Sequence, residues 1–398
     1  MNNYKYLIIG GGMTADAAVS GIREIDSEGS IGLISTESDP PYDRPPLSKA
    51  LWKGKSLDSV WRKTESKNVS MHLGRKIVSL SADELSARDD EGNDYHGEKL
   101  LLATGGTPRR FDFGGDDIIY YRTLEDYRSL ARMSKADDDF AVIGGGFIGA
   151  EIAAALAMNG KKVTMLFPDD GIGAHMYPHD LSQFLNGYFR EKGVEILPGE
   201  KVTGFSTRSR RHVLKTSSGR EVLAKGVIAG IGIEPNIELA TAAGLKLNKG
   251  IVVDKYLVTS HPHIYAAGDV AEFFNPVLGK HMRVEHEDNA SMMGRQAGRN
   301  MAGVSEPYHH LPYFYSDLFE LGYEAVGLLD ARMTIAADWE EPFKKGIVYY
   351  LSDDRVRGVL LWNVWKKLDS ARELIAQPGP FKAEDLNAKK APSWKISY

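Results

Sequence analysis

The sequence predicts an α/β protein with parallel sheets and more than one domain. Two segments, near residues 6–35 and 140–167, share one order of features: an apolar strand, a run of three glycines, an alanine-rich helix and a second apolar strand. Two copies of this order in one chain are far more specific than one. The length of 398 residues points the same way, because a single core rarely serves so long a chain.

The first segment carries the features of a nucleotide-binding turn. Gly10 permits a tight turn after the strand, Gly12 lets a pyrophosphate approach the backbone, and Ala15 keeps the helix close to the strand. The helix N-terminus, which includes Thr14, offers unpaired N–H groups to phosphates. A second strand, from about Ser30, is followed by Thr36 and Glu37, and a carboxylate at this place can bind an adenosine ribose. Glycine-rich turns also occur for structural reasons alone.

The second segment repeats the pattern and adds an indication of the nucleotide. Gly144-Gly145-Gly146 opens a helix that we expect to run to about Asn159, and the next strand, 162–167, is followed by Asp169. An acidic residue there suits the free 2′-hydroxyl of NADH, whereas the 2′-phosphate of NADPH would require arginine. NADH is therefore the expected nucleotide.

Two other strands end in residues suited to a nucleotide site. An apolar strand near 100–102 breaks at Ala103, Thr104 and Gly105, and a strand near 264–266 is followed by Asp269. Asp269 fits a ribityl hydroxyl at the carboxyl end of a sheet, and it fits equally well a helix N-cap for the next segment.

Composition excludes several classes of function. The chain has no cysteine, which removes a catalytic dithiol, a cysteine-bound iron–sulfur cluster and a cysteine zinc site. No metal site is predicted from its 11 histidines, because none has a ligand spacing. The formal charge of −5 argues against nucleic-acid binding, and no apolar run approaches the ~20 residues of a membrane span. Because the chain enters a strand directly, we expect a cytoplasmic protein.

Several blocks of the sequence occur together in one known family. They are the two glycine turns, the Ala-Thr-Gly and Gly-Asp strand ends, Pro41 to Lys49, Tyr315 to Leu318 and Gly322 to Ala325. From Tyr4 to about Ile375 the chain resembles the flavoprotein reductases with two dinucleotide-binding domains. Within them it is most similar to the ferredoxin reductases of oxygenase systems and to apoptosis-inducing factor.

The resemblance implies a nested layout of Rossmann-like domains. An FAD domain would cover residues 1–115 and 248–308, with an NAD domain inserted at 116–247. Residues 309–398 would form a small α+β domain, like the dimerisation domain of such reductases. In it the sequence itself predicts a hairpin of 347–351 and 356–362, a helix over about 366–375, and a tail from Gln377 that is extended or poorly ordered.

The resemblance also implies the roles of individual residues. Glu37 would bind the FAD ribose, Arg44 the pyrophosphate, and Lys49 would pair with Glu151 beside the reacting rings as the catalytic pair. Further flavin contacts would come from Arg109, Asp269, Glu285, His286 and Tyr315. The nicotinamide nucleotide would be held by Gly145, Gly146, Phe147, Ile148, Asp169, Gly232 and Glu324. Thr36, His175 and Tyr315 depart from the pattern of apoptosis-inducing factor, which has an acid, a lysine and a tryptophan there.

The implied activity is hydride transfer from NADH to flavin N5, with electrons passed on to a ferredoxin or rubredoxin, a quinone or another small acceptor. The alternative is a redox sensor like apoptosis-inducing factor, with a long-lived complex of reduced flavin and NAD⁺. A homodimer is compatible with either function. Without cysteine, the branches that use a redox disulfide are excluded.

Overall fold

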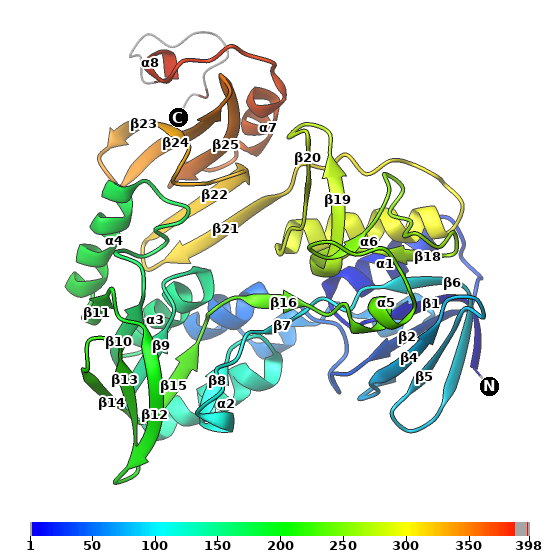
Figure 1. Ribbon diagram of the computed structural model, residues 1–398, viewed down its shortest axis with the longest axis horizontal. Coiled ribbons are helices and arrows are strands. Elements are labelled where there is room, and N and C mark those ends of the chain that lie inside the picture. The colour runs from blue at the N-terminus through cyan, green and yellow to red at the C-terminus, as the bar shows by residue number, and fades with distance from the viewer. Residues whose placement is uncertain (1, 387–395, 397–398) are drawn as a thin grey trace. The chain divides into compact units, whose positions relative to one another are not determined.

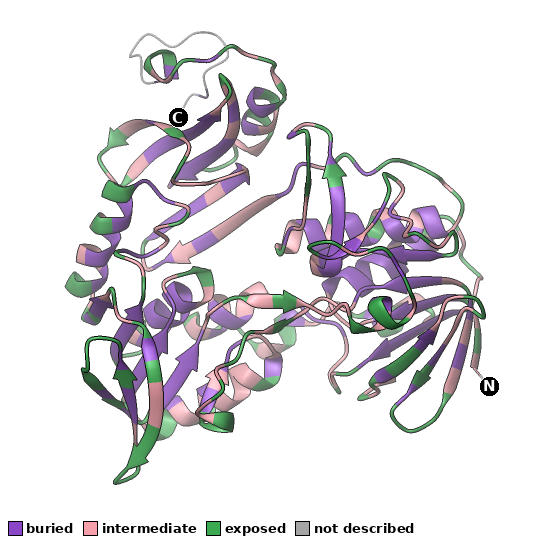
Figure 2. Ribbon diagram, in the orientation of Figure 1, coloured by how far each residue is buried: buried purple, intermediate pink, exposed green. Residues whose placement is uncertain are grey.

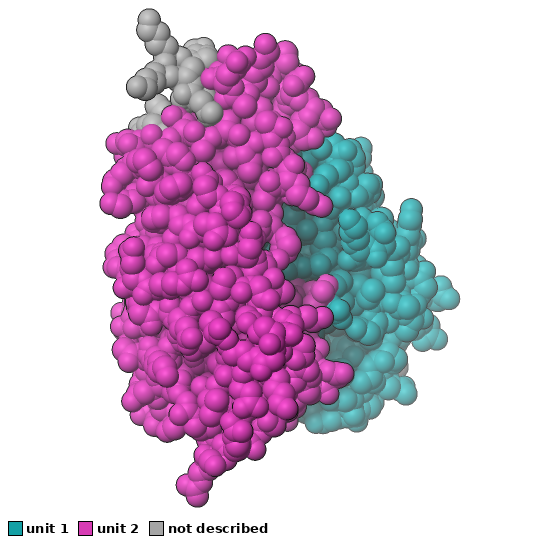
Figure 3. Space-filling model, turned by 60° about the vertical axis from the view of Figure 1, so that its left-hand side comes forward, with its two compact units in different colours: residues 1–44, 57–107, 234–312 teal, residues 45–56, 108–233, 313–398 magenta. Residues whose placement is uncertain are grey.

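The computed structural model describes residues 2–386 and 396, and it has the predicted α/β architecture (Figure 1). The chain forms two compact units, which Figure 3 colours separately. Unit 1 consists of residues 1–44, 57–107 and 234–312, and unit 2 of residues 45–56, 108–233 and 313–398. Both units are therefore assembled from segments that lie far apart in the sequence.

The core of unit 1 is a seven-stranded sheet in the order β3-β2-β1-β6-β5-β4, with β18 paired to β6. The apolar strand β1 (Asn2–Ile9) lies between β2 and β6 and is parallel to both, as a buried α/β strand requires. The other strands are β2 (Ile31–Ser35), β3 (Ser70–Leu73), β4 (Ile77–Ser81), β5 (Ser86–Asp89), β6 (Asp94–Leu102) and β18 (Ile264–Ala266).

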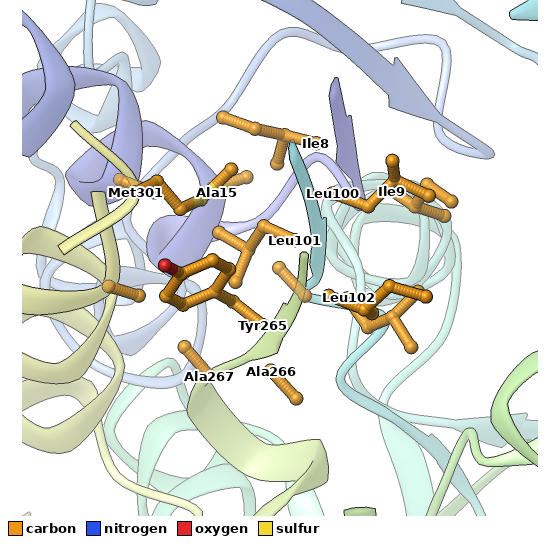
Figure 4. Packing of buried hydrophobic residues seen from close by; sticks show 14 of the residues in the cluster. Ile8, Ile9, Ala15, Leu100, Leu101, Leu102, Tyr265, Ala266, Ala267 and Met301 are labelled. Carbon is orange, nitrogen blue, oxygen red and sulfur yellow. The ribbon is translucent and has the colours of Figure 1, made fainter. Parts of the chain in front are cut away.

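Two helices of unit 1, α1 (Met13–Arg23) and α6 (Glu287–Met301), pack unusually closely. A Cβ atom on Gly294 would lie 2.3 Å from the carbonyl oxygen of Thr14, and one on Gly298 would lie 2.1 Å from that of Ala18. Glycine is thus required on α6 for this approach. Figure 4 shows the adjoining core, where side chains of β1, β6 and β18 meet Ala15 and Met301. Unit 1 also contains α5 (Glu238–Ala242), β17 (Ile251–Val252), β19 (Ala271–Asn275) and β20 (Lys280–Met282).

Unit 2 contains a second parallel sheet, in the order β11-β10-β9-β15-β8. Its central strand β9 (Asp139–Ile143) is almost entirely buried (Figure 2). The remaining elements of this part are β8 (Ile118–Tyr120), α2 (Leu124–Ala136), α3 (Phe147–Met158), β10 (Lys162–Phe167), α4 (His179–Glu191), β11 (Val194–Pro198) and β15 (Gly226–Ala229). An antiparallel sheet is formed by β12 (Val202–Arg208), β13 (Arg211–Thr216) and β14 (Glu221–Ala224).

Residues 313–398, called here the C-terminal module, belong to unit 2 and hold an antiparallel sheet in the order β21-β22-β25-β24-β23. The predicted hairpin is confirmed as β24 and β25. The strands are β21 (Tyr313–Leu318), β22 (Leu321–Gly327), β23 (Thr334–Glu341), β24 (Lys345–Ser352) and β25 (Arg355–Trp362).

The predicted helix of the C-terminal module begins later than expected. It is α7 (Leu368–Ala376), because Lys366 has a φ of 62° that a helix does not allow. The prediction of an extended tail is wrong at Ala383–Leu386, which form the short helix α8. Residues 377–382 form no helix or strand, as expected for the tail, and residues 387–395 and 397–398 lie outside the described residues.

The chain passes between the units at 44/45, 56/57, 107/108, 233/234 and 312/313. Two of these points, 107/108 and 233/234, fall within the short strands β7 (Gly106–Pro108) and β16 (Ile233–Pro235). The domain borders expected from the sequence remain predictions. They lie at 115/116, 247/248 and 308/309. Over the described part of the chain, no helix is long and apolar enough to cross a membrane. In the same residues, no cluster of three or more potential metal ligands occurs.

Candidate active site

The first glycine turn, in unit 1, has the geometry of a phosphate cradle. Gly10 adopts a φ of 134°, and a Cβ atom there would lie 2.1 Å from the carbonyl oxygen of Ala103. Helix α1 begins after Gly12, which makes no side-chain cap and has open space where a Cβ would stand. The first N–H groups of α1 are therefore accessible to an anion, while Thr14 and Ala15 are buried beneath the turn.

Past the second strand of unit 1, the structure brings Glu37 and Arg44 together. Oε1 of Glu37 lies 2.5 Å from Nη2 of Arg44, and the Tyr42 hydroxyl donates to Oε2 of Glu37 at 2.5 Å. The Arg44 guanidinium also lies over the Tyr42 ring, 5.1 Å from its centroid. Thr36 is exposed. A carboxylate and a guanidinium are thus held side by side, both only partly exposed.

The two strand ends of unit 1 are fixed by hydrogen bonds. Thr104 donates through Oγ1 to the Asn236 carbonyl at 2.8 Å, and Nδ2 of Asn236 donates back to the Thr104 carbonyl at 2.8 Å. Gly105, with a φ of 65°, accepts from the Asn236 amide. Asp269 lies inside a 3₁₀ turn (Gly268–Val270) whose N-cap is Ala267, so the N-cap interpretation of Asp269 is wrong.

Two further predicted residues stand before helix α6. Glu285 forms an ion pair with Arg283 at 2.6 Å, and Nη1 of Arg283 donates to the Asp269 carbonyl at 2.8 Å. His286 is the N-cap residue of α6, with extended backbone and no side-chain cap bond. Arg283 therefore connects two of the residues that the sequence predicted for the flavin side.

The second glycine turn, in unit 2, repeats the geometry of the first. Gly144 has a φ of 115°, and a Cβ on it would lie 2.3 Å from the Gly230 carbonyl oxygen. Gly146 caps α3 without a side-chain bond and has open space at the Cβ position. Ile148 packs against Gly230. The N–H groups at the start of α3 are accessible in the same way as those of α1.

A pocket of about 160 Å³ lies at this turn in unit 2. Its wall is mostly apolar, and it includes the predicted residues Gly145, Gly146, Phe147 and Asp169. Asp169 is in contact with His175, whose Nε2 lies 3.3 Å from Oδ1 of the carboxylate. The pocket therefore combines accessible helix N–H groups at one place with a carboxylate at another.

A buried ion pair joins Lys49 to Glu151 in unit 2. Nζ of Lys49 lies 2.7 Å from Oε1 of Glu151, and the side chains are 11% and 3% exposed. Ser48 donates to Oε2 at 2.5 Å and Ser316 donates to Oε1 at 2.6 Å. Buried charges are stable only when paired and hydrogen-bonded, and every oxygen of this carboxylate has a partner.

Tyr315 and Glu324 lie beside this pair in the C-terminal module. The Tyr315 ring centroid is 5.1 Å from Nζ of Lys49, and Glu324 is the direct cross-strand neighbour of Tyr315. Oε2 of Glu324 is buried and has no hydrogen-bond partner, and burial raises the pKa of this carboxyl group. Arg109 and Gly232 form a separate contact, through the Arg109 amide and the Gly232 carbonyl at 3.0 Å.

Sequence reasoning missed Ser48 and Ser316 as part of the site. Both stand next to predicted residues, Lys49 and Tyr315, inside the blocks that carried the resemblance. Nothing in their local pattern indicates that two serines 268 positions apart (316 − 48) meet one carboxylate.

The two accessible helix starts and the buried lysine–glutamate pair define a flavin- and nicotinamide-dependent oxidoreductase. The chain belongs to the pyridine nucleotide-disulphide oxidoreductase family, whose model matches residues 4–294. A second model, for the C-terminal domain of the mitochondrion-associated apoptosis-inducing factor, matches residues 297–339 and 332–377.

Several known proteins are similar over almost the whole chain. Mitochondrial apoptosis-inducing factor 1 of Dictyostelium discoideum is 32% identical over 97% of this chain and 80% of its own length. Putidaredoxin reductase of Pseudomonas putida is 30% identical over 99% of this chain and 97% of its own length. The crystal structure of the covalent putidaredoxin reductase–putidaredoxin complex matches with a TM-score of 0.90 at 30% identity, covering 98% of this chain and 97% of that one.

These findings confirm the resemblance, the fold class and the class of enzyme. The protein is an NAD(P)H-dependent flavin oxidoreductase, and FAD and a nicotinamide nucleotide are its cofactors. Despite the family's name, this chain has no cysteine and so has no redox disulfide.

Proposed function

We propose that this enzyme oxidises NADH in preference to NADPH, passes the electrons to a ferredoxin, and uses Lys49 and Glu151 as its catalytic pair. The observation that carries the proposal is the Lys49–Glu151 contact of 2.7 Å, buried in unit 2. An ion pair costs free energy to bury, so its presence one turn into the nucleotide-binding helix α3 suits a functional role better than a structural one.

The described residues fit both cofactors. In unit 1, the open N-terminus of α1 would hold the FAD pyrophosphate, and Glu37 and Arg44 would bind its ribose and phosphate. The remaining expected flavin contacts are Ala103, Thr104, Gly105, Arg109, Asp269, Glu285, His286 and Tyr315. In unit 2, the open N-terminus of α3 and the pocket at Gly145 would hold the nicotinamide nucleotide.

The preference for NADH rests on Asp169. Its carboxylate lines the pocket, where it would accept hydrogen bonds from a ribose and would repel a 2′-phosphate. The neighbouring His175 is 90% exposed, so water screens the charge that it carries when protonated.

When bound, the cofactors supply the redox chemistry, a hydride donor in NADH and a hydride acceptor in the flavin. The protein supplies position and charge. Lys49 provides a fixed cation, held by Glu151, which favours negative charge developing nearby. Glu151 holds the ammonium in one orientation, and the mostly apolar wall of the pocket offers few polar partners to water. Neither residue forms a covalent bond in this scheme.

A ferredoxin is the acceptor that the relatives favour. Putidaredoxin reductase is similar over nearly its whole length, and the chain that matches in the structure of its complex with putidaredoxin has the same fold. The other acceptors expected from the sequence, a rubredoxin or a quinone, are alternatives within the same proposal. A cytoplasmic location and a homodimer are expectations that the proposal does not depend on.

A second candidate function is a redox sensor with slow turnover. It is favoured by one observation, the match of the C-terminal part to the apoptosis-inducing factor model over residues 297–377. In this case the same Lys49–Glu151 pair would stabilise a long-lived complex of reduced flavin and NAD⁺.

Anaerobic titration with NADH, and in parallel with NADPH, tests the proposal. We expect the flavin absorbance to bleach at lower concentrations of NADH than of NADPH and to recover within seconds after a ferredoxin is added. A long-wavelength band that persists in air supports the sensor instead. A Glu151→Gln variant that is reduced as fast as the wild type refutes the role of the pair.

A further inference from the structure

Glu151 is held by three donors from two segments of the chain that are remote from its own. Lys49 and Ser48 come from the segment 45–56, Glu151 from helix α3, and Ser316 from strand β21 of the C-terminal module. All three segments belong to unit 2. The carboxylate is therefore the point at which three remote parts of the sequence meet.

We propose that Ser48 and Ser316 are positioning residues, which hold the Glu151 carboxylate in the orientation that pairs with Lys49. The inference rests on the proposed function, because it assigns a purpose to the lysine–glutamate pair that the proposal identifies. The two hydroxyls act through Glu151 and have no contact of their own with a reacting atom in this scheme.

The geometry of the bonds supports this assignment. A carboxylate paired with a single ammonium can rotate about its last side-chain torsion, which is a soft one. Ser316 donates to Oε1, the oxygen that also contacts Lys49, and Ser48 donates to Oε2 at 2.5 Å. Because the two oxygens are bound from different segments, the plane of the carboxylate is fixed.

Each serine is itself held in place. Ser48 is 5% exposed and ends a 3₁₀ turn (Pro45–Ser48), and the carbonyl before it, of Leu47, accepts from both Tyr121 and Trp52. Ser316 is 1% exposed and lies directly across the β21–β22 ladder from the fully buried Tyr323. Neither hydroxyl is exposed enough for bulk water to replace it, so its removal leaves the carboxylate short of a donor.

The arrangement gives the C-terminal module a direct part in the site. Through Ser316, the position of strand β21 determines how the carboxylate on α3 is oriented. A hydrogen bond at the surface would have little effect on the orientation of a carboxylate. The bond from Ser316 joins a buried donor to a buried charge, and hydrogen bonds to charged groups are among the stronger ones in proteins.

The test compares Ser48→Ala, Ser316→Ala and the double variant with the wild-type holoenzyme. In anaerobic stopped-flow, we expect the limiting rate of flavin reduction by NADH to fall about tenfold in each single variant, the effect of losing one hydrogen bond to a charged group. The apparent Kd for NADH should change less than about twofold in Ser48→Ala, because Ser48 is not among the residues that line the nucleotide pocket, whereas Ser316 is one of them. Ser48→Thr and Ser316→Thr, which keep the hydroxyl, should restore the rate.

A second measurement does not depend on turnover. The protein is labelled with isotope-enriched glutamate, and the infrared band of the Glu151 carboxylate is identified as the band that disappears in Glu151→Gln. In the absence of NADH, we expect this band to shift in both alanine variants. Ser134→Ala is the matched control, because Ser134 is a buried serine of α2 whose hydroxyl donates to the Ala131 carbonyl. It should leave the rate and the band unchanged.

The outcomes separate the two proposals. If the alanine variants match the wild type in limiting rate and infrared band while Glu151→Gln is slow, the positioning role is wrong and the catalytic pair stands. If Glu151→Gln is itself as fast as the wild type, the proposed function of the pair fails and the inference fails with it.

Discussion

Replacing Lys49 with methionine tests the energetics of the buried pair. The change removes the ammonium from a carboxylate that is only 3% exposed and leaves it two hydroxyl donors, from Ser48 and Ser316. Removing one partner of a buried ion pair costs about 3–5 kcal/mol. Because the two hydroxyls remain, we expect the free energy of unfolding to fall by an amount at the lower end of this range, about 3 kcal/mol. This loss is roughly a 150-fold change in the unfolding equilibrium.

Urea unfolding of the holoenzyme, followed by circular dichroism and by retention of the flavin, measures this loss. The double variant Lys49→Met/Glu151→Gln should regain most of the stability, because no uncompensated charge remains, and the coupling between the two changes should be about 2 kcal/mol.

The surface pair Lys225–Asp137, at 2.7 Å, provides the control. Lys225→Met should hardly move the urea midpoint, because exposed ion pairs contribute little. The reasoning is refuted if Lys49→Met unfolds at the wild-type urea concentration, or if the double variant is as unstable as the sum of the single changes.

Three other expectations concern the glycine turn, nucleotide choice and acid stability. Gly146→Val should weaken NADH binding at least about tenfold in titrations without unfolding the protein, because its side chain would fill the space open to a phosphate. Asp169→Ala should raise the ratio of kcat/KM for NADPH over NADH by about tenfold, as loss of a repulsive charge predicts. Burial alone would raise the pKa of Asp16, but hydrogen bonds from Lys67, Thr64 and Arg62 outweigh it and lower that pKa. The stability that Asp16 contributes is thus complete above pH 3.8, its ordinary value, and is lost as the pH falls through the lower folded value. In a plot of urea midpoint against pH, Asp16→Asn should therefore flatten the fall at low pH.

Each of these has a result that contradicts it. Gly144→Ala is the contrast for Gly146→Val: with a φ of 115° and a backbone oxygen 2.3 Å from the new Cβ, it should lower the thermal midpoint. Equal stability of the two glycine variants argues against the turn geometry. If Asp169→Ala leaves the ratio of kcat/KM for NADPH over NADH unchanged, the argument for a preference for NADH fails. If the urea midpoint of Asp16→Asn falls as steeply at low pH as that of the wild type, groups other than Asp16 cause the loss of stability.

Features encoded by local pattern could be predicted from the sequence. Gly10 and Gly144 have positive φ values that favour glycine, and the apolar runs around them can only be buried strands, so the two turns and the α/β class follow from short segments. The pairing of Lys49 with Glu151 was inferred from family resemblance, and the structure places the two side chains in contact.

Features that depend on distant segments could not be predicted in this way. The serines at Glu151 have no local signature, because the sequence around a serine does not show whether its hydroxyl faces water or a buried carboxylate. The start of α7 was misplaced by two residues because the left-handed backbone of Lys366 is set by its surroundings and is unusual for lysine. Glu324 gives no sign in the sequence that one of its oxygens lacks a partner.

The segmented assembly of unit 1 has a consequence for its synthesis on the ribosome. Strand β18 pairs with β6, and helix α6 packs on α1, yet β18 and α6 lie within residues 264–301. Until those residues emerge, Leu100, Leu101 and Ala18 lack their native covering, while the parallel sheet formed by residues 118–229 can already pair completely. The inserted sheet can therefore fold first, and the amino-terminal part must remain incomplete and dependent on protection from aggregation until about three quarters of the chain has been made.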